Sequence, residues 1–169
     1  KEAISSLSKA KTINPKNAKL WFTEGTLKIQ LFGRSAKRKD LSDGLHFIER
    51  GLEIEPQNAN AYFQLGNARI IQLNYPLALI AFKKASKIKP LFWEAINNEG
   101  LVLFEMGKTL EAINIWRTAI AISNNPETML ALAAALNQME KNNQESLKLA
   151  KKALDQNPNY VSSQHQKEQ

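Results

Sequence analysis

Residues 59–92 read ANAYFQLGNARIIQLNYPLALIAFKKASKIKPLF, and Gly66 and Pro90 in this stretch decide the fold. The interval from Gly66 to Gly100 equals the interval from Pro56 to Pro90. Two residue types that recur with the same interval indicate an internal repeat, here of about 34 residues. Apolar side chains recur at three- and four-residue steps within the stretch, which is typical of amphipathic helices.

The repeat continues toward both ends of the chain. Pro158 lies two periods after Pro90, whereas Gly25 and Pro15 each lie one period and seven further residues before their counterparts. This shared excess predicts an insertion of seven residues, and residues 34–40 fit it best. Four of the seven are basic: Arg34, Lys37, Arg38 and Lys39.

These positions resemble the tetratricopeptide repeat family, whose motif joins a Leu-Gly pair, small alanines, an aromatic residue and a closing proline over about 34 residues. Arg69 stands where the family prefers tyrosine, and Ala134 replaces the glycine in residues 127–160. The residues of the quoted stretch that match are Tyr62, Leu65, Gly66, Ala78, Phe82, Ala85 and Pro90. Residues 93–126 keep Gly100, Ala112, Trp116 and Ala119.

The resemblance implies an all-α fold, a right-handed α-α superhelix of about four helix pairs preceded by a half repeat. We expect a single tetratricopeptide solenoid over residues 1–169. Its parts are the second helix of a truncated repeat (1–17), a repeat with the insertion (18–58), three further repeats (59–92, 93–126 and 127–160) and a polar capping tail (161–169). The expected helices are 2–13, 18–33, 41–54, 59–73, 76–88, 92–106, 109–123, 127–140 and 143–156.

Small residues and caps have physical roles in this pattern. Glycine within a helix costs about 1 kcal/mol relative to alanine, so close helix packing must compensate at Gly66 and Gly100. Asn125 before Pro126 predicts a helix cap followed by a first-turn proline, and Asn17 and Asn58 are placed similarly. Pro76 also suits the first turn of a helix.

The family binds peptides in a concave groove lined by the first helix of each pair, and the resemblance implies such a groove here. An alternative stays open, in which the aromatic rings pack only against the adjacent helix. The principal groove residues are Phe22, Ile29, Phe63, Asn67, Ile70, Asn97, Leu101 and Phe104. Further inward positions are Lys19, Thr26, Asn60, Glu94, Thr128, Ala131, Ala135 and Gln138.

One subclass of the family grips an acidic C-terminus with a clamp of Lys, Asn and Arg. This chain departs from that set, because Phe22, Phe63 and Leu101 occupy inward positions and Glu94 repels a carboxylate. We therefore do not expect an acidic chaperone tail as the partner.

The net charge of +7 leaves the basic insertion open to two interpretations. It is a contact for an anionic partner, or it is a lengthened and solvated pair of helix ends. A basic solenoid that binds nucleic acid or an anionic surface is the alternative function, although lysines outnumber arginines and no surface aromatics alternate with them. Self-association through the unpaired helix at residues 2–13 is a third possibility.

The composition argues against catalysis. The chain has no cysteine, and its two histidines, His46 and His165, lie outside any motif. We expect no enzyme activity, cofactor or metal. The leading hypothesis is a scaffold that binds another protein or peptide, with membrane binding not expected of this segment.

The abundance of Lys, Asn and Ile is typical of an A/T-rich bacterial genome, so we expect a bacterial cytoplasmic protein. The chain begins at Lys1 rather than Met, which leaves an upstream signal or anchor open.

Overall fold

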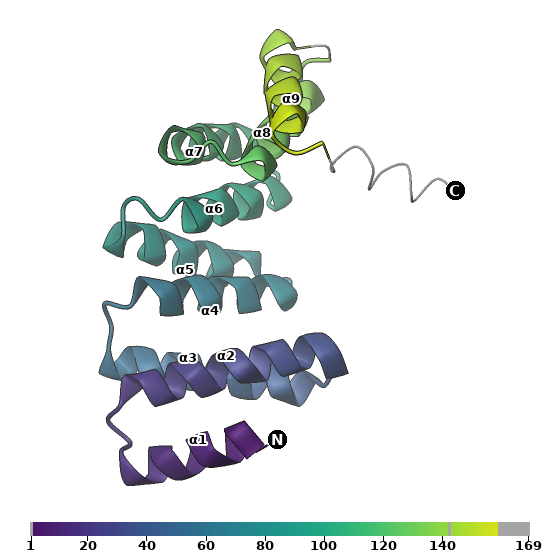
Figure 1. Cartoon of the computed structure of the whole chain (residues 1–169). Helices are drawn as coiled ribbons and strands as arrows, with labels where there is room; N and C mark the ends of the chain where they lie inside the picture. Colours follow the sequence, from purple (N-terminus) through teal and green to yellow (C-terminus); the bar gives the residue numbers. More distant parts are fainter. Residues whose placement is uncertain (1, 142, 159–169) are drawn as a thin grey trace. The chain divides into compact units, whose positions relative to one another are not determined.

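The protein is all-helical over the residues that its computed structural model describes, 2–141 and 143–158 (Figure 1). The polar tail expected at 161–169 lies outside these residues. The helices are α1 (Glu2–Ile13), α2 (Ala18–Ser35), α3 (Arg38–Ile54), α4 (Ala59–Ile71), α5 (Tyr75–Ile88), α6 (Trp93–Glu105), α7 (Thr109–Ile122), α8 (Pro126–Met139) and α9 (Gln144–Gln156).

The observed helices agree with the expected ones to within two residues at every end except one. The exception is the start of α3, which begins at Arg38 instead of residue 41, while α2 continues to Ser35. The inserted residues therefore lengthen both helices, and only Ala36 and Lys37 remain between them. Ala36 has a φ of 52°, in the left-handed region that closes the turn.

Asparagine side chains begin five of the helices, three of them as predicted. The Oδ1 of Asn17, Asn58 and Asn125 accepts a hydrogen bond from a backbone N–H in the first turn of α2, α4 and α8. Asn74 and Asn143 cap α5 and α9 in the same way. Each cap satisfies a backbone donor that has no partner within its own helix, which sets where the helix starts.

The chain divides into two compact units, residues 1–89 and 90–169. In the first unit, α1 packs on α2, α2 pairs with α3, and α4 pairs with α5, with α3 also packing on α4. In the second unit, α6 pairs with α7 and α8 pairs with α9, while α7 packs on α8. Within each unit, helices thus pair and the pairs pack on one another, the contact pattern of a helical-repeat fold.

The core of the first unit lies between α2, α3 and α4. Leu41, Leu45 and Ala68 form one buried cluster, and Ile48, Leu52 and Ala61 form another. Ile29 and Leu65 pack against both clusters, which makes the core continuous from the first pair into the second.

In the α4–α5 and α6–α7 pairs, a glycine on the first helix faces a bulky aromatic side chain on the second. A Cβ atom added to Gly66 would lie 2.5 Å from the Phe82 ring, and one added to Gly100 would lie 2.6 Å from the Trp116 ring. Phe82 and Trp116 are 0% and 2% exposed. The absence of a side chain at each glycine therefore lets the aromatic ring pack against the partner helix, as the sequence predicted.

The last pair shows what happens when this contact is lost. Ala134 takes the place of the glycine, and Ala150 takes the place of the ring. Ala134 is exposed and Ala150 is half-buried. With no large side chain of α9 at that position to cover it, this part of α8 remains open to solvent.

A buried ion pair attaches α1 to the first helix pair. The ammonium of Lys11 lies 2.8 Å from a carboxylate oxygen of Glu24, and the two side chains are 10% and 3% exposed. The same ammonium lies 4.3 Å and 3.7 Å from the ring centroids of Trp21 and Phe47. The hydroxyl of Ser8 donates to the other oxygen of Glu24. Carboxylate and rings together replace the water that Lys11 loses on burial.

We expect Gly100→Ala to destabilise the protein by about 1–3 kcal/mol, because the new methyl group overlaps the Trp116 ring and overpacking outweighs the gain in helix propensity. Urea unfolding measures the effect. Gly33→Ala is the matched control, since a Cβ there meets nothing within 4 Å in helix α2, and it should stabilise by about 0.5–1 kcal/mol. Equal effects of the two substitutions would contradict the packing argument.

Lys11→Met should leave Glu24 as a buried, unpaired charge and release α1, at a cost of about 3 kcal/mol. Hydrogen exchange of the α1 amides should accelerate by roughly a hundredfold. The double variant Lys11→Met, Glu24→Met removes both charges and should recover most of the protection. If the double variant exchanges as fast as the single one, the ion pair does not hold α1 in place.

Candidate functional site

A cleft of about 250 Å³ opens between the first helices of the first two pairs. We call it the α2–α4 cleft. Ile48 of α3 forms part of it, and the remaining lining comes from α2, α4 and the residue that caps α4. The lining residues are Phe22, Thr26, Ile48, Asn58, Asn60, Ala61 and Gln64.

Helix geometry explains why these side chains meet. Phe22 and Thr26 are one turn apart on α2, and Asn60 and Gln64 are one turn apart on α4, so each pair lies on one helix face. The Phe22 ring packs where Gly51 of α3 has no side chain, since a Cβ added to Gly51 would overlap the ring. The ring is therefore held in place by the first pair.

The cleft offers an apolar wall together with uncharged polar groups. Asn60 is exposed, while Thr26 and Gln64 are half-buried. Asn58 already uses its side chain to cap α4, where its Oδ1 accepts from Ala61 at 2.9 Å. An amide carries donors and an acceptor, so Asn60 and Gln64 can pair with both the N–H and the C=O groups of an extended chain.

The other predicted groove residues of the first unit have different surroundings. Ile29 is half-buried and packs on both core clusters, so most of its surface serves the fold. The centroids of the Phe63 and Phe82 rings lie 5.9 Å apart, at an interplanar angle of 56°. Phe63 therefore packs against the second helix of its own pair. Asn67 and Ile70 are half-buried on α4.

In the second unit, the predicted residues of α6 are near the surface but not equally open. Leu101 is 38% exposed. Phe104 is half-buried and its ring centroid lies 5.7 Å from that of Trp116. The indole of Trp116 donates to the backbone oxygen of Asn97 at 3.0 Å. The side-chain oxygen of Asn97 is buried and accepts no hydrogen bond from the described residues.

Two of the predicted groove positions were wrong, and four of the lining residues were not predicted as such: Ile48, Asn58, Ala61 and Gln64. Thr128 and Ala135 of α8 are both 0% exposed, because this face of the helix packs inside the second unit, so a partner does not reach them. Gln64 was missed, although it lies one helical turn beyond Asn60, the spacing that places both on one face.

At the basic insertion, the nearby acidic side chains form ion pairs, whereas three of the basic side chains do not. The ammonium of Lys28 on α2 lies 3.0 Å from a carboxylate oxygen of Asp40 and 3.4 Å from one of Asp43. The ammonium of Lys39 lies 3.1 Å from the other carboxylate oxygen of Asp43. Arg34, Lys37 and Arg38 are exposed and form no ion pair with residues 2–141 or 143–158. This geometry matches lengthened helix ends, and it also presents three basic side chains that a partner can contact.

The pairing shifts the titration of two groups. The hydrogen bond to Asp40 raises the pKa of Lys28 above its usual 10.5, with Asp43 adding to the effect and burial opposing it. Burial by itself raises the pKa of Asp43. The hydrogen bonds and charges of Lys39 and Lys28 outweigh burial, so the pKa of this carboxyl lies below its usual 3.8.

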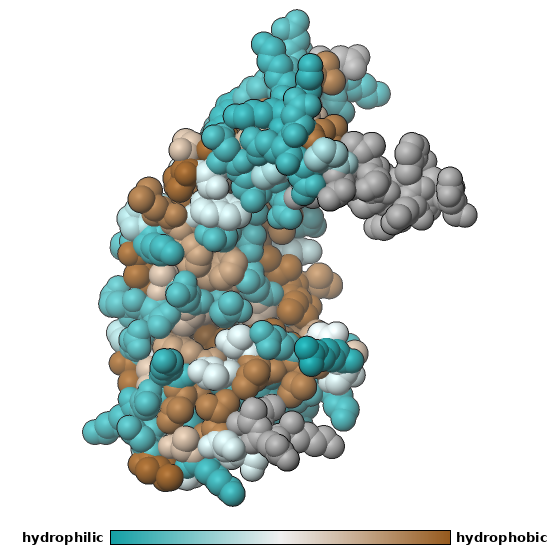
Figure 2. Space-filling model, viewed as in Figure 1, coloured by the Kyte–Doolittle hydropathy of each residue, from teal (hydrophilic) through white to brown (hydrophobic). Residues whose placement is uncertain are grey.

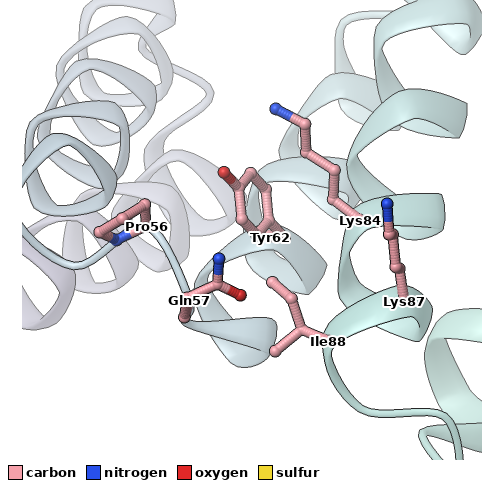
Figure 3. A pocket seen from close by; sticks show the side chains of 6 residues that line it. All are labelled: Pro56, Gln57, Tyr62, Lys84, Lys87 and Ile88. Atoms are coloured by element: carbon pink, nitrogen blue, oxygen red, sulfur yellow. The ribbon is translucent and has the colours of Figure 1, made fainter.

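A second cleft, of about 350 Å³, lies between α5 and the loop that precedes α4 (Figure 3). The ammonium of Lys84 is 5.1 Å from the ring centroid of Tyr62. Lys87 projects from the next turn of α5, and Gln57 faces Ile88 across the opening. The chemistry here is cationic and solvated, in contrast to the uncharged α2–α4 cleft.

Residues 2–141 and 143–158 contain neither a cluster of metal ligands nor a membrane-spanning helix. In this part of the chain, no group of three or more His, Asp or Glu side chains could hold a metal ion. No helix there is both long and apolar enough to span a bilayer.

The sequence matches no protein-family model and no curated protein, but solved structures are similar to it. A crystal structure of MamA has a TM-score of 0.81 at 20% identity, covering 95% of this chain and 90% of that one. Pseudomonas aeruginosa pilF has a TM-score of 0.74 at 20% identity, with 91% and 65% covered. TTC0263, a thermophilic TPR protein in Thermus thermophilus, has a TM-score of 0.71 at 20% identity, with 97% and 86% covered. The chain therefore has a tetratricopeptide-type fold, as its repeats predicted.

Asp43→Asn should reduce stability at neutral pH and have less effect in acid. A carboxyl whose pKa is lowered by folding stabilises the protein above its unfolded value of 3.8, and this contribution is lost as the pH falls through the lowered pKa. Urea unfolding of both proteins from about pH 7 to about pH 3 measures the difference. Asp155→Asn, an exposed carboxylate on α9, is the control and should show little difference. A pH-independent effect of Asp43→Asn would contradict the assignment.

Proposed function

We propose that this chain is a non-catalytic protein-interaction module that binds an extended segment of a partner protein in the α2–α4 cleft. The observation that carries the proposal is the meeting of one fixed aromatic wall, Phe22, with the polar side chains of Thr26, Asn60 and Gln64 in a cleft of about 250 Å³. Apolar anchoring beside a few polar groups is the usual composition of a binding pocket.

The size of the cleft favours one side chain of the partner at a time. The Phe22 ring and Ile48 supply apolar contacts, while Asn60 and Gln64 stand where a neighbouring peptide group can pair with them. None of the seven lining residues is charged, so binding there depends on shape and hydrogen bonds. We expect a partner segment with an apolar residue in an otherwise extended, uncharged stretch.

The fold supports this use of the cleft. Each helix pair buries its apolar face against its neighbours, which leaves the first helices with a surface on which successive turns can contact a long ligand. The Phe22 ring is seated on Gly51 before any partner arrives. A preformed site loses little side-chain freedom on binding, which preserves affinity.

A peptide library displayed on phage tests the proposal although the partner is unidentified. The wild-type chain is the bait, and binders are then measured against Asn60→Ala, Gln64→Ala, a double variant that keeps Phe22 and the core intact. Loss of two hydrogen bonds should weaken binding about tenfold or more. Asn114→Ala removes an exposed amide from α7 and should leave affinity unchanged. If every selected peptide binds the double variant as tightly as wild type, the cleft is not the site.

A further inference from the structure

The insertion gives the first helix pair an overhang that the second pair lacks. Helix α2 has 18 residues and α3 has 17, whereas α4 has 13 and α5 has 14. At 1.5 Å per residue, α2 is longer than α4 by roughly 7 Å, about one and a half turns. Figure 1 shows the α2–α3 turn reaching past the end of α4.

A cleft of about 710 Å³ lies under this overhang, and we call it the turn cleft. One side comes from the lengthened helices and the other from the end of α4 and the turn into α5. The lining residues are Phe32, Arg38, Leu41, Ser42, Ile71, Gln72, Leu73 and Asn74. Figure 2 shows hydrophobic surface at the α4–α5 turn next to the hydrophilic α2–α3 turn. The cleft is within the usual size range of ligand sites.

Leu73, which lines this cleft, combines an unfavourable backbone conformation with an exposed apolar side chain. Its φ of 57° is in the left-handed region, which costs a bulky residue about 1 kcal/mol or more, and its side chain is 72% exposed. One period later, Gly107 occupies the same turn position with a φ of 77°. Glycine takes this conformation without strain, so neither backbone nor burial explains a leucine here. Its exposed side chain forms part of the lining of the turn cleft, where a bound molecule can contact it.

The charge around the turn cleft is positive. Arg38 lines the cleft, and Arg34 and Lys37 lie on the same turn, all three exposed and without ion pairs among the described residues. The two nearby carboxylates, Asp40 and Asp43, are neutralised by Lys28 and Lys39. None of the eight lining residues is acidic.

We propose that the turn cleft is a second binding site, which takes an acidic peptide segment carrying a bulky apolar side chain. The apolar side chain packs against Ile71 and Leu73, beside the Leu41 floor, while carboxylates of the segment pair with Arg38 and its basic neighbours. Arginine suits this role because its planar guanidinium pairs with a carboxylate through two hydrogen bonds. Burial of Leu73 on binding removes its exposed apolar surface from water.

Nucleic acid fits the same cleft less well. Proteins that bind single strands combine basic grooves with aromatic rings on which bases stack. Phe32 is the one aromatic residue of the lining, and its ring packs against the Leu41, Leu45 and Ala68 cluster. An apolar cleft beside arginine matches a peptide that carries both an apolar side chain and a carboxylate.

The turn cleft and the α2–α4 cleft are separate sites on the same helix. Asn60 and Ile71 lie near opposite ends of α4, roughly 16 Å apart along the helix axis. The two sites also differ in charge, since the α2–α4 cleft has an uncharged lining. A partner can thus be lost from one site and kept at the other, so the two proposals fail independently.

The test is a phage-display selection on the wild-type chain after depletion on Leu73→Gly. Leu73→Gly removes the apolar contact and relieves the backbone, so the variant should fold at least as stably as wild type. The surviving peptides should combine acidic residues with Leu, Ile, Phe or Trp. A synthetic copy of the most enriched peptide should bind Leu73→Gly and Arg38→Gln about tenfold more weakly than wild type, by fluorescence anisotropy at ~150 mM salt.

Controls separate this site from charge alone and from the first site. Lys16→Gln removes an equal charge near the opposite end of α2 and should leave the affinity unchanged, as should Asn60→Ala, Gln64→Ala. The proposal is overturned if no acidic–apolar peptide is enriched, or if the enriched peptide binds Leu73→Gly as well as wild type. It is also overturned if a labelled single-stranded RNA, or vesicles of phosphatidylcholine and phosphatidylserine, compete with the peptide and depend equally on Leu73.

Discussion

The contact between a small residue on a first helix and a bulky one on its partner controls how closely the helix pairs pack. Added side-chain atoms at three glycines would overlap the facing residue, and a buried side chain has little room to move away. The recurring contacts are Gly25 with Ile48, Gly66 with Phe82, and Gly100 with Trp116. The contact recurs in the α2–α3, α4–α5 and α6–α7 pairs, and it is lost in the α8–α9 pair, where Ala134 and Ala150 take its place.

The packing of the helix pairs also determines which side chains remain exposed and can contact a partner. The Phe22 ring packs on Gly51 and forms one wall of the α2–α4 cleft. Thr26, one turn further along α2, lines the cleft together with Asn60 and Gln64 of α4. At the other end of α2, both helices of the pair are longer than those of the next pair, and their surplus turns form one side of the turn cleft. The turn cleft thus results from the unequal lengths of two stacked pairs.

Helix positions were predictable because their signals are local. Asn58 and Asn125 cap the helices that follow them, and the proline and glycine spacings place every helix to within a few residues. The groove was harder to predict. Phe63 packs on Phe82 within its own pair, and Thr128 is fully buried, because the width of a helix face that neighbours cover depends on their side chains. The lengthened pair, α2 and α3, contains the residues predicted to be inserted. Ion pairs such as that of Lys28 with Asp40 join these two helices, and no local pattern predicts them.

The sequence by itself determined the repeat length, the helices, their caps and the small residues at which they meet, because each has a signal in local residue pattern or in a fixed spacing. Only the tertiary structure decided which side chains share a cleft, that Lys11 is buried against Glu24, and that Leu73 stands strained and exposed in a turn. Those features depend on how one helix lies against another. Their geometry is set when the helices pack, which no local pattern specifies.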